Sequence, residues 1–351
     1  MKIIPLIMMD YMKFRQTHLF LLFVIAQLLV SCNGRNVQHS FEGEALGTSY
    51  HIKYYSEENI PFQKGLDSII ESINNSMSTY RKNSDISRIN DGDSSIVVDQ
   101  NFRKVLEQSS KIYQESNGFF DPTVGNLVNA YGFGPDTKKV KLSAFAIDSM
   151  LRYVGLNKVK INSDNTISKQ NSNIYLDFNA IAKGYTVDVI ANYLNSYGID
   201  DYLIEVGGEL VAKGINQGSG EAWVVAIDDP LQKEGNRVFE ATLYLKDRGM
   251  ATSGNYRKFR LDSSTGLRYV HTINPITGRS EKSNLLSASV LAKNCALADG
   301  YATAFMALGL ERSQEMLSRI KDVDVYFIYA EENEEVKIFS TAGFNEVLRP
   351  D

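Results

Sequence analysis

One histidine is the residue best placed for acid–base chemistry in this chain. His271 is one of only four histidines, and it lies in the short segment from Tyr269 to Gly278, which also contains Pro275. An imidazole with an ordinary pKa can accept a proton near neutral pH. A lone histidine on a strand is more often structural, so the functional interpretation of His271 depends on the groups around it.

A carboxylate and a hydroxyl four residues apart form a second candidate group. Asp299 and Thr303 lie in a segment that we predict to be helical, so their side chains share one face. The small residues around them leave room for a ligand. Two oxygen donors suit a hard cation such as Mg²⁺, which keeps other sites for water or phosphate. The alternative is a buried aspartate that bonds a neighbouring backbone, with Thr303 packed in the core.

A third group lies where a strand leads into a helix. We predict that a strand ends at Asp177 and that a helix begins near Ala180. The free N–H groups at a helix start can bind phosphate. Lys183 lies in the first helical turn, where the helix dipole disfavours positive charge, and this favours an anionic ligand nearby. An ordinary capped helix is the alternative interpretation.

Glycine-rich and aromatic loops could complete a nucleotide site. Residues 205–209 (Glu-Val-Gly-Gly-Glu) and 251–254 (Ala-Thr-Ser-Gly) follow predicted strands and match neither a P-loop nor a dinucleotide fingerprint. Tyr80, Phe119 and Phe120 lie in polar loops. Such rings either stack on a planar group such as adenine or isoalloxazine, or fill the core.

The elements that must position these groups indicate an α+β protein. At 351 residues and 43% hydrophobic, the chain can bury a large core, as one large domain or two intimate ones. The elements do not alternate strictly between strand and helix, which argues against a doubly wound sheet. The predicted helices cover 62–77, 101–116, 142–153, 180–197, 296–308 and 311–320. The predicted strands cover 43–55, 202–211, 222–227, 238–246, 249–253, 257–261, 286–292 and 323–329.

The N-terminus is typical of an export signal. Lys13 and Arg15 precede the apolar run from Leu19 to Val30, which is shorter than the about 20 residues that a membrane span needs. Residues 29–32, Leu-Val-Ser-Cys, resemble a lipobox, so we predict that Cys32 carries lipid. A non-cleaved anchor and a soluble secreted protein are the alternatives. We expect a signal peptide at 1–31, a tether at 32–40 and one domain at 41–351, on the periplasmic side of a bacterial cell envelope.

Taken together, these segments resemble the ApbE family, the FAD:protein FMN transferases. The matches occur in the family's order and cover nearly all of the chain after the signal. The matching segments are 47–50 (Gly-Thr-Ser-Tyr), 77–90, 120–125, 177–188, 206–209, 251–254, 271–278 and 298–303.

The resemblance implies a T-fold-related mixed sheet with packed helices and FAD in a cleft between two intimate subdomains. It implies that Asp299, Thr303 and the backbone carbonyl of Ala180 hold Mg²⁺. His271 becomes the base that accepts a proton from the attacking hydroxyl. The flavin and adenine contacts that the resemblance implies are Leu46, Tyr80, Phe119, Phe120, Asp121, Asp177, Lys183, Thr252, Ser253 and Ile273.

The resemblance also implies an activity. The family attaches FMN through a phosphoester to a threonine or serine of a flavoprotein and releases AMP. The implied acceptor is an exported or membrane flavoprotein, such as a subunit of an NADH:quinone reductase or Rnf-type complex. The net charge of −5 gives no reason to expect a nucleic-acid partner. Leu46, Glu209 and Asn274 depart from the residues common at these positions, which are methionine, aspartate and aspartate.

Two other functions remain open at this point. One is a Mg²⁺-dependent FAD pyrophosphatase that gives FMN and AMP, with water in place of the protein hydroxyl. The other is a non-catalytic flavin-binding lipoprotein, although storage of flavin requires neither a base nor a metal.

Overall fold

The computed structural model describes residues 36–135, 142–232, 237–254, 259–261, 268–270, 272–280, 283–331 and 335–350. His271, Cys32 and the predicted signal peptide lie outside the described residues. Residues 39–55 and 60–351 belong to one unit, and residues 1–38 and 56–59 to a smaller one. In the smaller unit, the Ser56 hydroxyl accepts a hydrogen bond from the Glu58 N–H at 3.1 Å, which closes a tight turn.

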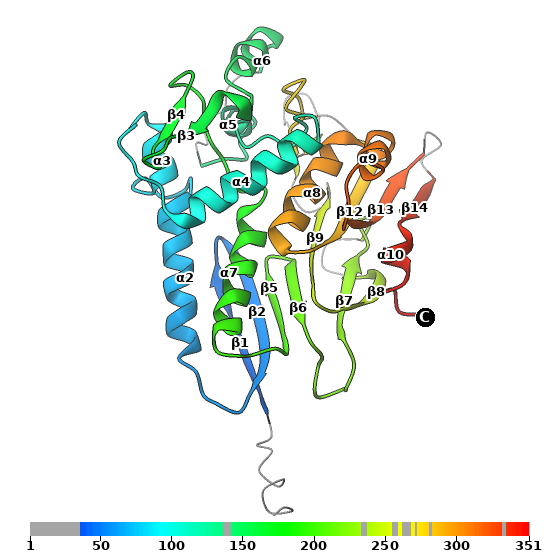
Figure 1. Ribbon diagram of the computed structural model, residues 1–351. Helices are drawn as coiled ribbons and strands as arrows, with labels where there is room; N and C mark the ends of the chain where they lie inside the picture. The colour runs from blue at the N-terminus through cyan, green and yellow to red at the C-terminus, as the bar shows by residue number, and fades with distance from the viewer. Residues whose placement is uncertain are drawn as a thin grey trace, which may run out of the picture. The chain divides into compact units, whose positions relative to one another are not determined.

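A sheet of eight strands in the order β1-β2-β5-β6-β9-β12-β13-β14 forms the framework (Figure 1). These strands are β1 (Val37–Ala45), β2 (Thr48–Ser56), β5 (Tyr202–Val206), β6 (Glu209–Lys213), β9 (Arg248–Gly254), β12 (Leu285–Ala292), β13 (Asp324–Ala330) and β14 (Val336–Ser340). Every ladder from β2 to β14 is antiparallel. The α+β class is confirmed. In place of the mixed sheet that we expected, each of these six ladders is antiparallel.

Two tight turns lie side by side at one end of this sheet. Leu46 and Gly47 join β1 to β2 with φ values of 52° and 74°, and Gly207 and Gly208 join β5 to β6 with 64° and 96°. Two positive φ angles in sequence are typical of the two-residue turns that match strand twist. A Cβ atom on Gly207 would lie 2.7 Å from Cγ2 of Thr48. The continuous strands predicted at 43–55 and 202–211 are therefore each a hairpin.

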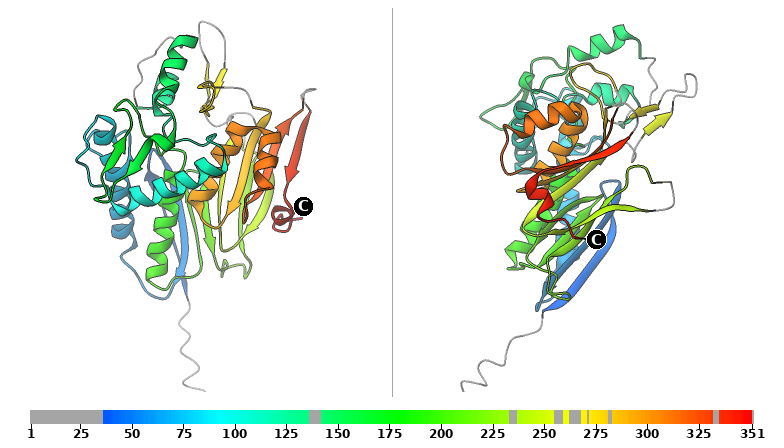
Figure 2. Two further views of the ribbon diagram at one scale, coloured as in Figure 1. Left: turned by 45° about the horizontal axis from the view of Figure 1, so that its top comes forward. Right: turned by 90° about the vertical axis from the view of Figure 1, so that its right-hand side faces the viewer.

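Helices cover one face of the sheet (Figure 2). They are α2 (Phe62–Met77), α4 (Gln100–Glu115), α7 (Ala182–Ser196), α8 (Cys295–Leu308) and α9 (Leu310–Leu317). The helices α7 and α8 contact the strands directly, whereas α2 and α4 pack against these two helices. Apolar side chains such as Phe305 and Ile190 are almost fully buried in this layer. Among the described residues, no helix is long and apolar enough to cross a membrane.

The opposite face of the sheet is covered by a hairpin of β7 (Trp223–Asp228) and β8 (Phe239–Leu245) and by the short helix α10 (Ala342–Asn345). The strands predicted at 222–227 and 238–246 are present, and they form a two-stranded sheet separate from the eight-stranded one. Among the described residues, the strands β10 (Phe259–Leu261) and β11 (Arg268–Val270) form another two-stranded sheet. Strand periodicity shows that a segment is extended, but it does not show which sheet the strand joins.

Smaller elements carry the loops that surround the predicted site. They are α3 (Asp85–Asn90), α5 (Gly125–Ala130), α6 (Ala144–Leu151), the 3₁₀ turn η1 (Leu156–Lys158), β3 (Val159–Ile161) and β4 (Ile167–Lys169). The Asn90 side chain donates to the Leu176 carbonyl and accepts from the Leu176 N–H, both at 2.8 Å. The Lys169 ammonium donates to the carbonyls of Ile89 and Ile174. These bonds fix the segment that leads into Asp177.

Candidate active site

The site is organised where α7 begins against the first turns of α8. A Cβ atom on Gly184 would lie 2.4 Å from the backbone oxygen of Cys295 and 2.8 Å from Cβ of Asp299. Real Cβ atoms do not approach other atoms so closely, so only glycine permits this helix contact. The position of Asp299 relative to α7 therefore depends on the missing side chain at residue 184.

Asp299 is 3% exposed, and its Oδ2 accepts a hydrogen bond from the Gly184 N–H at 3.0 Å. The backbone bond that we considered as the alternative to metal binding is thus present, and Oδ1 takes no part in it. In a regular helix the Gly184 N–H would donate to the Ala180 carbonyl. Among the described residues, no backbone N–H donates to that carbonyl. The Asp299 bond therefore leaves the Ala180 oxygen open to another partner.

Thr303 lies one turn after Asp299 on α8 and is partly buried. With the Ala180 carbonyl, these residues offer a carboxylate, a hydroxyl and a backbone oxygen, which is the oxygen-donor chemistry that Mg²⁺ prefers. The described residues contain no group of three or more histidine, cysteine, aspartate or glutamate side chains that could hold a metal. The donor set fits a hard cation with several waters or phosphate oxygens in its shell, rather than a zinc centre.

A second carboxylate and a lysine adjoin Asp299. Glu209, the first residue of β6, is 2% exposed and forms an ion pair with the Lys183 ammonium. The other carboxylate oxygen of Glu209, Oε2, is buried and has no hydrogen-bond partner among the described residues. Burial raises the pKa of Asp299 to about 7; the nearby Glu209 adds to the shift, and the Lys183 charge opposes it. In the sequence, Glu209 stands out only as a departure from the family pattern, and no local signal predicts its ion pair with Lys183.

The loop at Asp177 brings several predicted residues together. The Asp177 carboxylate accepts from the Asn179 N–H at 2.7 Å, and the backbone N–H of Asp177 donates to the Pro122 carbonyl at 2.7 Å. Burial raises the pKa of Asp177. Tyr80 is 62% exposed, and its pKa is raised by partial burial and by the nearby Asp177 charge. Tyr80 thus lies close to Asp177. Asp177 in turn precedes Ala180 by three residues.

In the neighbouring loop, Phe119 and Phe120 differ in burial, which decides for each whether its ring fills the core or can contact a ligand. Phe120 is 2% exposed and belongs to the core, and its N–H donates to the Ser116 hydroxyl at 3.0 Å, so its ring fills the core. Phe119 is partly exposed, with the Arg312 guanidinium 5.2 Å from its ring centre. Asp121 accepts from the Thr123 and Leu156 N–H groups at 2.8 and 3.2 Å, and burial raises its pKa to about 6. The Asp121 carboxylate therefore holds its own loop together.

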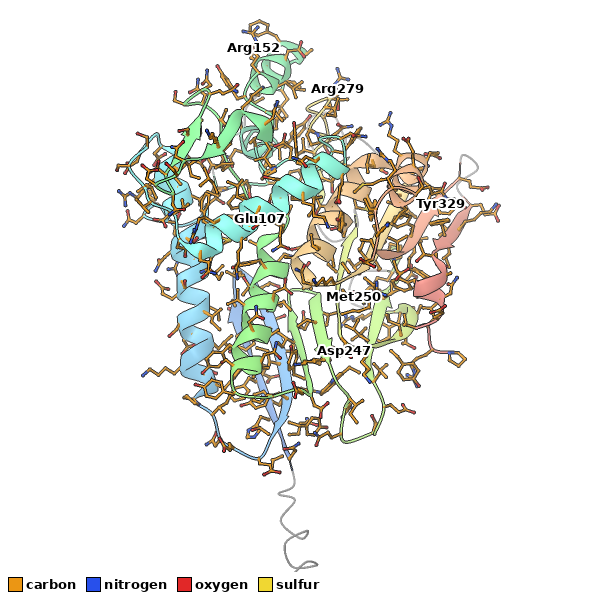
Figure 3. The ribbon with its side chains drawn as sticks, viewed as in Figure 1. Glu107, Arg152, Asp247, Met250, Arg279 and Tyr329 are labelled. Carbon is orange, nitrogen blue, oxygen red and sulfur yellow. The ribbon has the colours of Figure 1, made fainter. Side chains whose placement is uncertain are left out.

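The two predicted residues on β9 face opposite ways. Side chains alternate along a strand, and Met250 packs with the hairpin layer while Ala251 packs with the helices (Figure 3, where Met250 is labelled). Thr252 accordingly lies on the hairpin face, where its hydroxyl is 2.8 Å from that of Ser289. Of the pair, only Ser253 points to the face that carries Asp299.

Two further residues that we predicted to contact FAD, Leu46 and Ile273, pack against apolar side chains of the protein. Leu46 sits in the β1–β2 turn and packs against buried clusters. Ile273 is 6% exposed and packs with Leu127 and Ile147. The Asn274 carboxamide oxygen accepts from the N–H groups of Ile276 and Thr277, which makes a fixed turn at the position where we noted an unusual asparagine. That turn lies in the segment labelled by Arg279 in Figure 3.

Comparisons with known proteins identify the family of the chain. The sequence model of the ApbE family matches residues 46–327. The chain belongs to the ApbE family. It is 37% identical over 292 residues to the FAD:protein FMN transferase of Vibrio cholerae serotype O1, across 81% of this chain and 86% of that relative.

Solved structures of the family have the same fold. The flavin transferase ApbE from Vibrio cholerae superposes with a TM-score of 0.79 at 35% identity, covering 89% of this chain and 100% of that one. The flavinyl transferase ApbE of Pseudomonas stutzeri, in its apo form, gives a TM-score of 0.79 at 29% identity, with 89% and 97% covered. The family assignment made from sequence is confirmed. The flavin contacts, the metal ligands and the role of His271 stay predictions.

Replacing Lys183 tests the buried charge beside Asp299. Lys183→Met leaves the Glu209 carboxylate buried without its counterion, so we expect the free energy of unfolding to fall by about 1–3 kcal/mol. The double variant Lys183→Met/Glu209→Gln should recover part of this loss, because the amide carries no charge. Urea denaturation without FAD or Mg²⁺ measures both.

The control is Lys213→Met, since Lys213 pairs with Asp200 on the surface, where that carboxylate is 73% exposed. Exposed pairs contribute about 0–1 kcal/mol. A double variant no more stable than Lys183→Met would contradict the assignment.

Proposed function

We propose that this protein transfers the FMN part of FAD to a threonine or serine hydroxyl of an exported or membrane flavoprotein, and releases AMP. The observation that carries the proposal is the Asp299–Gly184 contact, which leaves the Ala180 carbonyl open beside a carboxylate and a helix start. The names of the relatives support the same chemistry. The positive end of the helix dipole at the start of α7 and the nearby ammonium of Lys183 suit the pyrophosphate of FAD.

The oxygen donors would hold a magnesium ion. Asp299, Thr303 and the Ala180 carbonyl are the ligands in this proposal. When bound, the ion neutralises pyrophosphate charge, which phosphoryl-type transfer needs more than covalent help. Asp177, Tyr80 and Phe119 would then orient the rings of FAD, since these three surround the start of α7 or the loop joined to it.

The proton of the attacking hydroxyl goes to His271 in this proposal. The hydroxyl oxygen of the acceptor forms a bond to the phosphorus of the FMN half. The bond from that phosphorus to the oxygen bridging to the AMP half breaks, and AMP leaves with that oxygen. A protein hydroxyl is a weak nucleophile at neutral pH, so a base with a pKa near the working pH accelerates the step.

We also propose that lipid on Cys32 holds the enzyme at the periplasmic side of a bacterial envelope membrane. The sequence at 29–32 supports this proposal. The acceptor would be a flavoprotein that faces the same compartment, of the kind found in NADH:quinone reductase or Rnf-type complexes. Placing the enzyme on the membrane brings it close to such subunits.

Transfer can be measured directly. The protein is incubated with FAD, Mg²⁺ and a flavoprotein domain that carries a threonine acceptor, and the acceptor mass and released AMP are recorded. We expect the acceptor to gain one FMN for each AMP, and an acceptor with that threonine replaced by alanine to gain none. Free FMN with AMP and an unmodified acceptor indicates the pyrophosphatase instead. Intact FAD throughout would leave only a flavin carrier.

Two variants separate the metal from the base. Asp299→Asn keeps an oxygen that can accept from the Gly184 N–H but removes the charge, so we expect Mg²⁺-dependent AMP release to disappear. His271→Ala should bind FAD normally and transfer FMN about 10²–10⁴-fold more slowly, as loss of a general base does. Full Mg²⁺ stimulation in the first variant would exclude Asp299 as a ligand. Lost FAD affinity with normal transfer in the second would make His271 a binding group.

A further inference from the structure

A carboxylate of α7 holds the start of α8. Asp188 accepts hydrogen bonds from the N–H groups of Cys295 at 2.8 Å and Ala296 at 2.9 Å, one with each oxygen. The first N–H groups of a helix have no partner within that helix. Asn294, which precedes α8, provides an acceptor for another of these groups, because its side-chain oxygen accepts from the Leu297 N–H at 2.9 Å. The start of α8 is thus fixed both from within and from its neighbour.

The two helices hold each other reciprocally. Asp188 of α7 binds the first turn of α8, and Asp299 of α8 binds the Gly184 N–H in the first turn of α7. Gly184 and Asp188 are four residues apart on α7, as are Cys295 and Asp299 on α8. Residues at this spacing share a helix face. The two carboxylates therefore act about one helical turn apart along the same contact.

We propose that Asp188 is a positioning residue for the metal site, an inference that rests on the proposed function. The predicted ligands come from two elements, because Ala180 precedes α7 while Asp299 and Thr303 lie on α8. Mg²⁺ requires nearly ideal octahedral geometry, so small changes in the separation of its ligands weaken binding. By fixing α8 against α7, Asp188 sets that separation without touching the ion. Groups that orient metal ligands change metal affinity by about 10–100-fold when they are replaced.

Asn294 supplies a matched control. Its side chain also caps α8, but the bond lies entirely within the segment from Asn294 to Leu297 and does not reach α7. Loss of either cap weakens the start of α8. Of the two losses, only that of Asp188 removes hydrogen bonds between α7 and α8. Metal affinity therefore separates a positioning role from a merely structural one.

The experiment measures cation binding to the full chain in detergent, without FAD. Mn²⁺ is titrated and its free concentration is followed by electron paramagnetic resonance, with Mg²⁺ as competitor. We expect Asp188→Ala to raise the dissociation constant at least about tenfold, as loss of a ligand-orienting group does. Asp188→Asn keeps one accepting oxygen and should fall between Asp188→Ala and the unaltered protein. Asn294→Ala should bind almost as the unaltered protein does, although its melting temperature falls as well.

The outcomes distinguish this inference from the proposed function. If Asp188→Ala binds as tightly as the unaltered protein, or if Asn294→Ala weakens binding equally, Asp188 is not a positioning residue and the metal site stands. If the unaltered protein binds no cation, both fail. If Asp188→Ala does not fold, Asp188→Asn decides, and unchanged affinity in that variant overturns the inference.

Discussion

The close contact between α7 and α8 is the constraint on which the candidate site depends. It exists because residue 184 is glycine, and a single methyl group there would collide with the backbone of Cys295. The contact lets Asp299 take the Gly184 N–H, and this bond in turn leaves the Ala180 carbonyl open. The sheet supports the contact from beneath, since both helices pack directly on its strands. One missing side chain thus links the fold to the chemistry.

The region around Asp299 also carries an excess of buried negative charge. Among the described residues, the buried carboxylates of Asp299 and Glu209 lie near the ammonium of Lys183. Burial without full compensation raises the pKa of Asp299 to about 7. A divalent cation would offset this excess of negative charge and keep the aspartate ionised. The phosphates of FAD would then complete the balance beside the helix start. Binding of metal and of nucleotide would therefore favour each other here.

Sequence predicted the parts of this site that depend on local spacing. The four-residue spacing of Asp299 and Thr303 predicts that they share one helix face. The order of the sequence motifs predicts the family. The contacts between distant segments do not follow from such patterns. The residues around Lys183 do not predict its ion pair with Glu209, and those around Asp188 do not predict its bonds to the start of α8. Such contacts form only when strands and helices pack together. The same limit explains why the strand pattern does not show which sheet β7 and β8 join, and why Phe119 and Phe120 could be told apart only by their burial.

The most direct test of the account is to locate a cation and FAD in crystals of the protein. Crystals grown with FAD and Mn²⁺ would show the metal through its anomalous scattering. We predict a peak within coordination distance of Asp299, Thr303 and the Ala180 carbonyl, with the pyrophosphate of FAD against the start of α7. A metal bound elsewhere, or a pyrophosphate remote from that helix start, would contradict the central claim.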